Sequence, residues 1–153
     1  MLYATLPCQS PGLDLDGILL EVGAQFTLDW DGIHGFPHWE RVHRHAVRIA
    51  RLRDGSLPVV ELFAILHDSC RENENRDPEH GPRAAEFARS LAGTHFELPK
   101  KELSELCIAI RDHSRGRVST NVNIQTCWDA DRLDLGRVGI KPDPRFLSKE
   151  ALL

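Results

Sequence analysis

The sequence predicts an all-α fold, a compact helical bundle of five to six core helices. Apolar residues recur at the three- and four-residue spacing of an amphipathic helix in several separate stretches. The run from Pro58 to Leu66 is apolar around its circumference, which is typical of a buried helix. No stretch shows the alternating pattern of a half-buried strand. We expect a single domain over residues 1–153, with 1–33 as an N-terminal extension and 137–153 as a surface tail.

Composition places the chain among ordinary globular proteins, since 41% of its residues are hydrophobic and 27% are charged. The formal net charge of −4 argues against binding to polymeric nucleic acid, which normally requires a basic face. No segment is apolar for long enough to cross a membrane, and the first residues lack the pattern of a secretory signal. The cysteines are scattered and form no CxxC pair, so we expect a cytoplasmic location without a disulfide framework. The eight histidines are the compositional clue to function.

Two helices are predicted before the apolar run. A short helix over residues 18–26 would cover the core. A longer amphipathic helix begins at Pro37, a residue suited to a first helical turn, and ends near Arg53. Its apolar stripe consists of Trp39, Val42, Ala46, Ile49 and Ala50. His38 lies beside this stripe, and the turn residues 54–56 end the helix.

The buried helix that begins at Pro58 ends at the dipeptide His67-Asp68. Because the preceding residues are apolar on every side, the helix places an imidazole and a carboxylate in the interior. An ionised carboxylate without a partner is very costly to bury, and the usual compensations are an opposite charge, several hydrogen bonds or a metal ion. The dipeptide therefore predicts a polar site inside the bundle.

Three further helices are predicted, over roughly residues 77–91 (with a start between 77 and 82), 99–112 and 121–135. The apolar stripe of the first, extended backwards by one turn, meets His80. The stripe of the second continues to His113. In the third, Asp131 occupies a position that the helical period assigns to an apolar residue.

Asp131 is the most informative of these positions. Asp129 in the same helix points about 200° away when each residue turns by about 100°, so it is the second choice for an inward carboxylate. A buried ion pair between Asp131 and an arginine such as Arg41 or Arg111 is the alternative explanation.

Four groups thus have independent reasons to face one interior point: His38, His67, Asp68 and Asp131. This mixed nitrogen and oxygen set suits a divalent ion such as Mn, Fe, Co, Ni or Zn, with Mg less favoured. Four protein ligands leave positions open for a water, whose pKa the metal lowers, and for a substrate oxygen. We expect one ion, with two as the alternative.

In these residues the sequence resembles the HD-domain metal-dependent phosphohydrolases, whose pattern is H…HD…D on an all-helical core, and in particular their small stand-alone bacterial members. The matches are His38, the pair His67-Asp68, and Asp131 within the stretch 129–134, and the resemblance covers about residues 34–135. It implies that these four residues bind the metal and that a small phosphorylated molecule, such as a nucleotide, is the substrate. It also implies that Asp68 orients or deprotonates the attacking water.

His80 and His113 are assigned to catalysis by the same resemblance. Some family members place two extra histidines between the HD pair and the final Asp, where they bind a second metal or the substrate phosphate. The alternative is that both are satisfied histidines at helix ends. The interval from Asp68 to His80 is shorter than a full two-metal site leads one to expect.

Candidate substrate-binding residues are His34, Arg115 and Arg132. A guanidinium group matches a phosphate in bidentate fashion, and His34 precedes the first helix of the motif. The arginines considered as phosphate ligands are Arg71, Arg111, Arg115, Arg117 and Arg132, of which Arg115 and Arg132 are preferred. The plain alternatives are a loop histidine and solvated arginines.

The sequence therefore predicts a metal-dependent phosphohydrolase that acts on a phosphate ester through metal-activated water. Two rivals remain. A di-iron oxygenase of the HD type would need His80 and His113 as iron ligands. A metal-stabilised sensor or binding domain without turnover would have a closed metal shell. The sequence does not indicate the oligomeric state.

Overall fold

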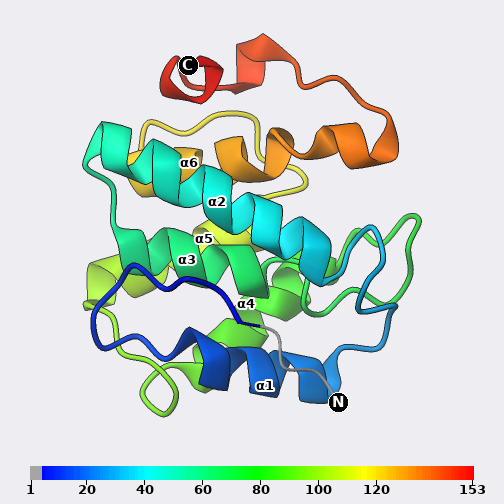
Figure 1. Ribbon diagram of the computed structural model, residues 1–153, viewed down its shortest axis with the longest axis vertical. Coiled ribbons are helices and arrows are strands. Elements are labelled where there is room, and N and C mark those ends of the chain that lie inside the picture. The colour runs from blue at the N-terminus through cyan, green and yellow to red at the C-terminus, as the bar shows by residue number, and fades with distance from the viewer. Residues whose placement is uncertain (1–4) are drawn as a thin grey trace.

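The structure is a computed structural model that describes residues 5–153, and in this range it contains six α-helices and no β-strand. The predicted all-α fold is confirmed (Figure 1). The helices are α1 (Leu15–Gln25), α2 (Phe36–Arg53), α3 (Leu57–Leu66), α4 (His80–Leu91), α5 (Lys100–Asp112) and α6 (Val122–Arg132). Three short 3-10 helices follow, η1 (Leu135–Val138), η2 (Pro144–Phe146) and η3 (Glu150–Leu152). None of the helices in the described range has the length and apolar composition of a membrane span.

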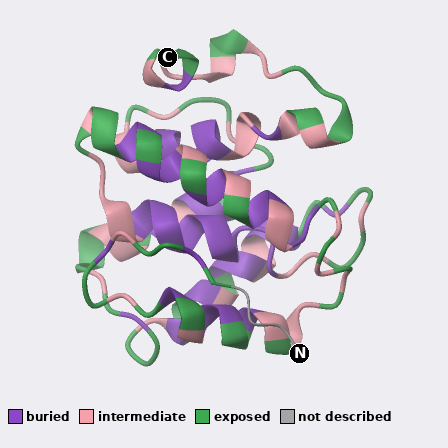
Figure 2. Cartoon of the chain, viewed as in Figure 1, coloured by how far each residue is buried: buried purple, intermediate pink, exposed green. Residues whose placement is uncertain are grey.

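Helix α3 is the centre of the bundle and contacts each of the other five α-helices. The side chain of Ser56 caps its first turn by accepting a hydrogen bond from the Val59 amide at 3.4 Å. Every residue from Val59 to Leu66 is buried, as Figure 2 shows by the continuous purple of this helix. Each large apolar side chain buried in this way contributes about 1.5–3 kcal/mol. The C-terminal end of α3 is therefore held firmly at the middle of the molecule.

The turn that leads into α2 is fixed by close packing. A side chain at Gly35 would collide with the backbone, because a Cβ atom there would lie 2.1 Å from the carbonyl oxygen of Trp30. The indole nitrogen of Trp39 donates a hydrogen bond to the carbonyl of His34 at 3.0 Å. These two contacts set the orientation of the first turn of α2, which carries His38.

Helix α6 ends at Arg132, three residues earlier than predicted. The amides of Leu133 and Asp134 bond back to the carbonyls of Asp129 and Asp131, so the chain turns sharply and continues into η1. This early end matters for the site, because it brings Asp134 back towards α2.

The C-terminal segment packs against α2 and α6 through η3, in which Ala151 is buried. Its anchor is Asp129, whose carboxylate accepts hydrogen bonds from the Ser148 hydroxyl at 2.5 Å and the Ser148 amide at 3.0 Å. The C-terminal segment is thus held beside the end of α6.

Candidate metal centre

The first ligand set begins at the end of α3. His67 caps this helix and is fully buried, and its Nδ1 lies 3.1 Å from the carbonyl oxygens of both Phe63 and Ala64. Because a carbonyl can only accept a hydrogen bond, Nδ1 carries the proton and Nε2 is left as a potential ligand. The ring also stacks on Phe63, at 4.8 Å between centroids and 13° between planes. Packing and hydrogen bonding therefore fix the orientation of this imidazole.

His38 is held in the same manner from the first turn of α2. It is fully buried, and its Nδ1 lies 2.7 Å from Oδ2 of Asp134. Burial alone would lower the pKa of His38, but the carboxylates of Asp131, Asp134 and Asp68 raise that pKa to about 10. The Nε2 atom of His38 faces the same point as that of His67.

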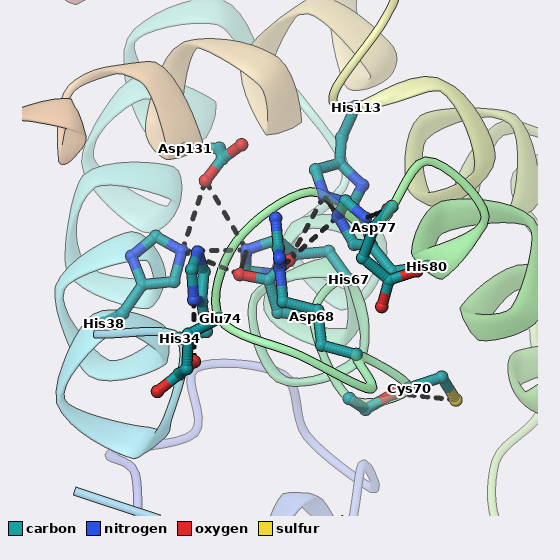
Figure 3. A network of polar contacts seen from close by, with 12 residues as sticks. His34, His38, His67, Asp68, Cys70, Glu74, Asp77, His80, His113 and Asp131 are labelled. Carbon is teal, nitrogen blue, oxygen red and sulfur yellow. Dashed lines mark hydrogen bonds and ion pairs between the residues drawn. The ribbon is translucent and has the colours of Figure 1, made fainter. Parts of the chain in front are cut away.

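Both predicted carboxylates converge on these two nitrogens (Figure 3). The Nε2 atoms of His38 and His67 are 3.0 Å apart. Asp131 Oδ1 lies 3.2 and 3.5 Å from them, and Asp68 Oδ2 lies 3.4 and 3.6 Å from them. Ligands about 2.1 Å from one ion are separated by roughly 3.0–3.4 Å in octahedral or tetrahedral geometry. Each carboxylate oxygen therefore lies at a distance from the two nitrogens that suits a shared divalent ion.

A second set of potential ligands lies on the other side of Asp68. The Nε2 atoms of His80 and His113 are 2.9 Å apart, and each lies 3.3 Å from Asp68 Oδ1. Their Nδ1 atoms contact main-chain carbonyls of Asp77 at 2.5 Å and Ile110 at 2.7 Å, so both rings present Nε2 inwards. Asp68 thus directs one oxygen to each pair of histidines.

The electrostatics favour ionised carboxylates. Burial raises the pKa of Asp68, but His67, His113, His38 and His80 around it hold that pKa well below its usual range. For Asp131, burial is likewise outweighed, here chiefly by hydrogen bonds from His38 and His67, and the pKa is well below its usual range. Both groups are therefore ready to bind a cation at neutral pH.

The cluster opens onto a cavity of about 350 Å³. Its lining includes Asp68, His80, His113 and Asp131 from the cluster. The rest of the lining comes mainly from the loop after α5 and from the segment that follows α6. The volume is within the range of small-molecule sites, so the potential ligands are accessible to a substrate rather than enclosed.

The remaining predicted residues are placed as follows. His34 lines the cavity and its Nδ1 lies 2.9 Å from Glu74 Oε1. Arg132 also lines it, with its guanidinium group donating to the carbonyls of Gly116 and Phe146. Arg115 is outside the lining residues and pairs with Asp112 at 3.5 Å.

The choice between the two aspartates of α6 is clear in the structure. Asp129 is fully buried, but it accepts hydrogen bonds from Gln125 and Ser148 and lies in none of the groups of potential metal ligands. Arg41 and Arg111, the predicted alternative partners of Asp131, pair with Asp134 and Asp112 instead.

Two residues of the site were not among the preferred candidates, although Arg71 was one of the arginines considered as phosphate ligands. Asp134 is the last residue of the motif stretch 129–134 and was given no role of its own. Its contact with His38 depends on the early end of α6. Arg71 lines the cavity, and its buried Nε has no hydrogen-bond partner and lies 3.7 Å from Asp68 Oδ1. The sequence signal that favoured Arg71 over the other arginines is its position three residues after Asp68, which places the two side chains close together.

Neither the known family models nor the curated proteins gave a match to this chain. Among solved structures, one similar to this chain is a predicted HD superfamily hydrolase from an uncultured Thermotogales bacterium. The two chains are 30% identical, with a TM-score of 0.70, over 90% of this chain and 80% of that chain. The chain belongs to the HD superfamily.

This membership confirms the family that the motif residues predicted. It also agrees with the arrangement of the site, in which the H, HD and D residues of the pattern lie together at the centre of the bundle. The description of the neighbour supports a metal-dependent HD-type hydrolase at the superfamily level.

Proposed function

We propose that this HD protein is a metal-dependent phosphohydrolase that hydrolyses a phosphate ester of a small molecule, such as a nucleotide. One observation carries the proposal: four imidazoles and two ionised carboxylates converge at the wall of a cavity that also contains arginines. Carboxylates and imidazoles together suit divalent ions, and guanidinium groups suit phosphate.

Two ions fit the donor atoms. His38, His67, Asp131 and Asp68 Oδ2 would hold the first, and His80, His113 and Asp68 Oδ1 would hold the second. The sequence spacing favoured one ion, but the symmetric position of Asp68 between two histidine pairs supports two. When bound, divalent ions lower the pKa of water and neutralise charge on phosphoryl oxygens.

The chain's own residues orient the phosphate. Arg71 is held by its NH1 atom, which donates to the carbonyls of Asn73 and Asn75 at 3.0 and 3.1 Å. Its Nε is buried without a partner, at a cost of about 1–3 kcal/mol for an unsatisfied polar group. A phosphate oxygen beside Asp68 would satisfy this donor. Arg71 is therefore the proposed ligand of the reacting phosphate.

The deciding experiment combines metal analysis with an activity screen. Purified protein is analysed for bound metals and then assayed for phosphate release from phosphate monoesters and nucleotides with Mn, Co, Ni or Mg. We expect metal-dependent release that Asp68→Asn abolishes while the circular dichroism spectrum is unchanged. Asp143→Asn, at a partly exposed aspartate that pairs with Arg145 and is not in the cavity lining, is the matched control and should remain fully active. Absence of phosphate release with every metal would contradict the proposal.

The position of His80 and His113 beside Asp68 also keeps the di-iron oxygenase as a second candidate, because that activity needs both as iron ligands. Two bound irons per chain, with oxygen consumption and no phosphate release, would favour it. A closed, non-catalytic metal site is less well supported, because the ligands border a cavity of about 350 Å³.

A further inference from the structure

Two arginines of the cavity make no direct ion pair, although Asp131 and Asp129 act on the charge of Arg132 at longer range. Arg132 and Arg137 both line the cavity, and within residues 5–153 neither has a carboxylate at ion-pair distance. Arginines elsewhere in the described chain commonly have one, such as Arg83 with Asp77 at 2.7 Å and Arg145 with Asp143 at 2.7 Å. The protein as a whole is acidic, with a net charge of −4, so this local positive charge is a specific feature of the cavity.

Main-chain carbonyls hold both guanidinium groups in place. Arg132 donates to the carbonyls of Gly116 and Phe146, each at 2.7 Å. Arg137 donates to the carbonyls of Ile33 at 2.8 Å and Asp134 at 2.9 Å. A carbonyl orients a guanidinium group without cancelling its charge, and each group has five N–H donors, more than these contacts use. The groups are thus preorganised and still able to bind an anion.

The charge of the metal centre indicates which anionic group of the substrate Arg132 and Arg137 bind. Two divalent ions with Asp68 and Asp131 leave a net charge of about +2 when the histidine ligands are neutral, and a phosphate monoester dianion balances it. Arg71, beside Asp68, already adds a positive charge next to this phosphate. The charges of Arg132 and Arg137 are therefore in excess of what one phosphate needs.

We propose that the substrate carries two anionic groups, a phosphate at the metal centre and a second phosphate or a carboxylate at Arg132 and Arg137. The inference rests on the proposed function and specifies its substrate class. A cavity of about 350 Å³ holds a small molecule of this kind. The two arginines determine specificity by binding the part of the substrate that does not react.

The test compares ligands that cannot be hydrolysed. Metal-loaded protein is titrated by calorimetry with α,ω-alkane bisphosphonates of two to five carbons, and with the alkyl monophosphonate of the same length in each case. We expect at least tenfold tighter binding of the bisphosphonate at the best length. Phosphonocarboxylates of the same lengths show whether the second group is a phosphate or a carboxylate, by which series binds more tightly.

Variants connect this gain to the two arginines. Arg132→Gln and Arg137→Gln should each reduce the advantage to less than threefold, calculated against the monophosphonate affinity of the same variant. Arg132→Lys and Arg137→Lys keep the charge and should restore part of the gain, which excludes a merely structural effect. Arg145→Gln is the matched control, because Arg145 is exposed and paired with Asp143, and it should retain the full advantage. Thermal unfolding of each variant verifies that it is folded.

The outcomes separate this inference from the proposed function. Equal binding of both ligand types at every length, or a gain that survives both glutamine variants, overturns the second anionic subsite alone. If the bisphosphonate binds more tightly in an arginine-dependent manner but the protein releases no phosphate, the second anionic subsite is supported and the proposed hydrolase activity is contradicted. Failure of every phosphonate to bind overturns the subsite, and the proposed function is then decided by the phosphate-release assay alone.

Discussion

Nδ1 of His38 lies 2.7 Å from Oδ2 of Asp134, and the other oxygen of this carboxylate accepts a hydrogen bond from Arg41 Nε at 2.7 Å. Burial raises the pKa of Asp134, but His38 and Arg41 lower it below its usual value. The carboxylate is therefore ionised and held from both sides. It fixes the ring of His38 with Nε2 directed at the other potential ligands.

Replacement of Asp134 by Asn should weaken metal binding about 10- to 100-fold, the usual effect of losing a carboxylate that orients a histidine ligand. The amide is similar in shape but cannot stabilise the donating imidazole to the same degree. Calorimetric titration with Mn²⁺ measures the change. Asp143→Asn removes a partly exposed carboxylate outside the ligand groups and should bind Mn²⁺ as the wild type does. Unchanged affinity in Asp134→Asn would mean that His38 is oriented by packing alone.

Metal binding near neutral pH should release about one proton from His38. With its pKa raised to about 10, the metal-free protein holds an imidazolium at this position, whereas a metal requires the neutral ring. Calorimetry in buffers of different ionisation enthalpy counts the released protons. The apparent metal affinity should rise with pH, by up to tenfold per unit below about pH 10. A binding enthalpy that does not depend on the buffer would contradict this expectation.

The same shift has a consequence for the stability of the metal-free protein. The pKa of His38 is higher in the folded state than the ordinary value of 6.5. Its contribution to stability is therefore fully present below about pH 6.5 and is lost as the pH rises through about 10. The melting temperature without metal should fall over this range, and addition of metal should largely remove the pH dependence.

The sequence was sufficient to predict the helices, and the four motif residues that it singled out lie close together in the structure. Apolar periodicity located the elements, and Asp131 was identified because it interrupts an apolar stripe. A polar residue at an apolar position is informative when it lies within a helix, where the helical period predicts the direction of its side chain. Asp134 lies beyond the end of α6, where main-chain hydrogen bonds set the direction of the chain, so helical periodicity could not place it.

Contacts distant in sequence were also beyond prediction. Glu61 lies within the apolar run of α3 and gave no sign of its partners, His43 and Ser10, which are 18 and 51 residues away. The position of Arg137 in the cavity was equally unpredictable, because its guanidinium group donates to the carbonyl of Ile33, 104 residues earlier in the chain. Only the packing of the bundle brings these groups together.

Replacement of Arg71 by Gln should lower kcat by roughly 10²–10³, the range for the loss of one oriented donor to a charged reacting group. The buried, unpartnered Nε beside Asp68 is the reason. Arg71→Lys keeps the charge but not the planar group, and it should recover only part of the rate. Steady-state kinetics with the best substrate of the screen tests this. A fully active glutamine variant would assign Arg71 to the loop structure only.

Glu61 should be a major contributor to stability although it is not among the residues that line the cavity. Its fully buried carboxylate accepts hydrogen bonds from the Ser10 hydroxyl at 2.5 Å and the Gln9 amide at 2.8 Å, and it lies 2.7 Å from His43 Nε2. It thereby attaches the N-terminal segment to α3. Removal of one partner from such a buried network costs about 3–5 kcal/mol, so Glu61→Ala should lower the free energy of unfolding by that amount in urea denaturation.

The pH dependence provides a second measurement for Glu61. Burial raises its pKa, but hydrogen bonds from His43, Ser10 and the Gln9 amide lower it below 4.5. The contribution to stability is therefore present above about pH 4.5 and is lost as the pH falls through the folded-state pKa, so wild type and Glu61→Gln should converge in acid. Glu86→Ala, at an exposed pair with Arg89, should change stability by only about 0.5 kcal/mol. Equal effects of Glu61→Ala and Glu86→Ala would show that the N-terminal segment is held by its apolar contacts instead.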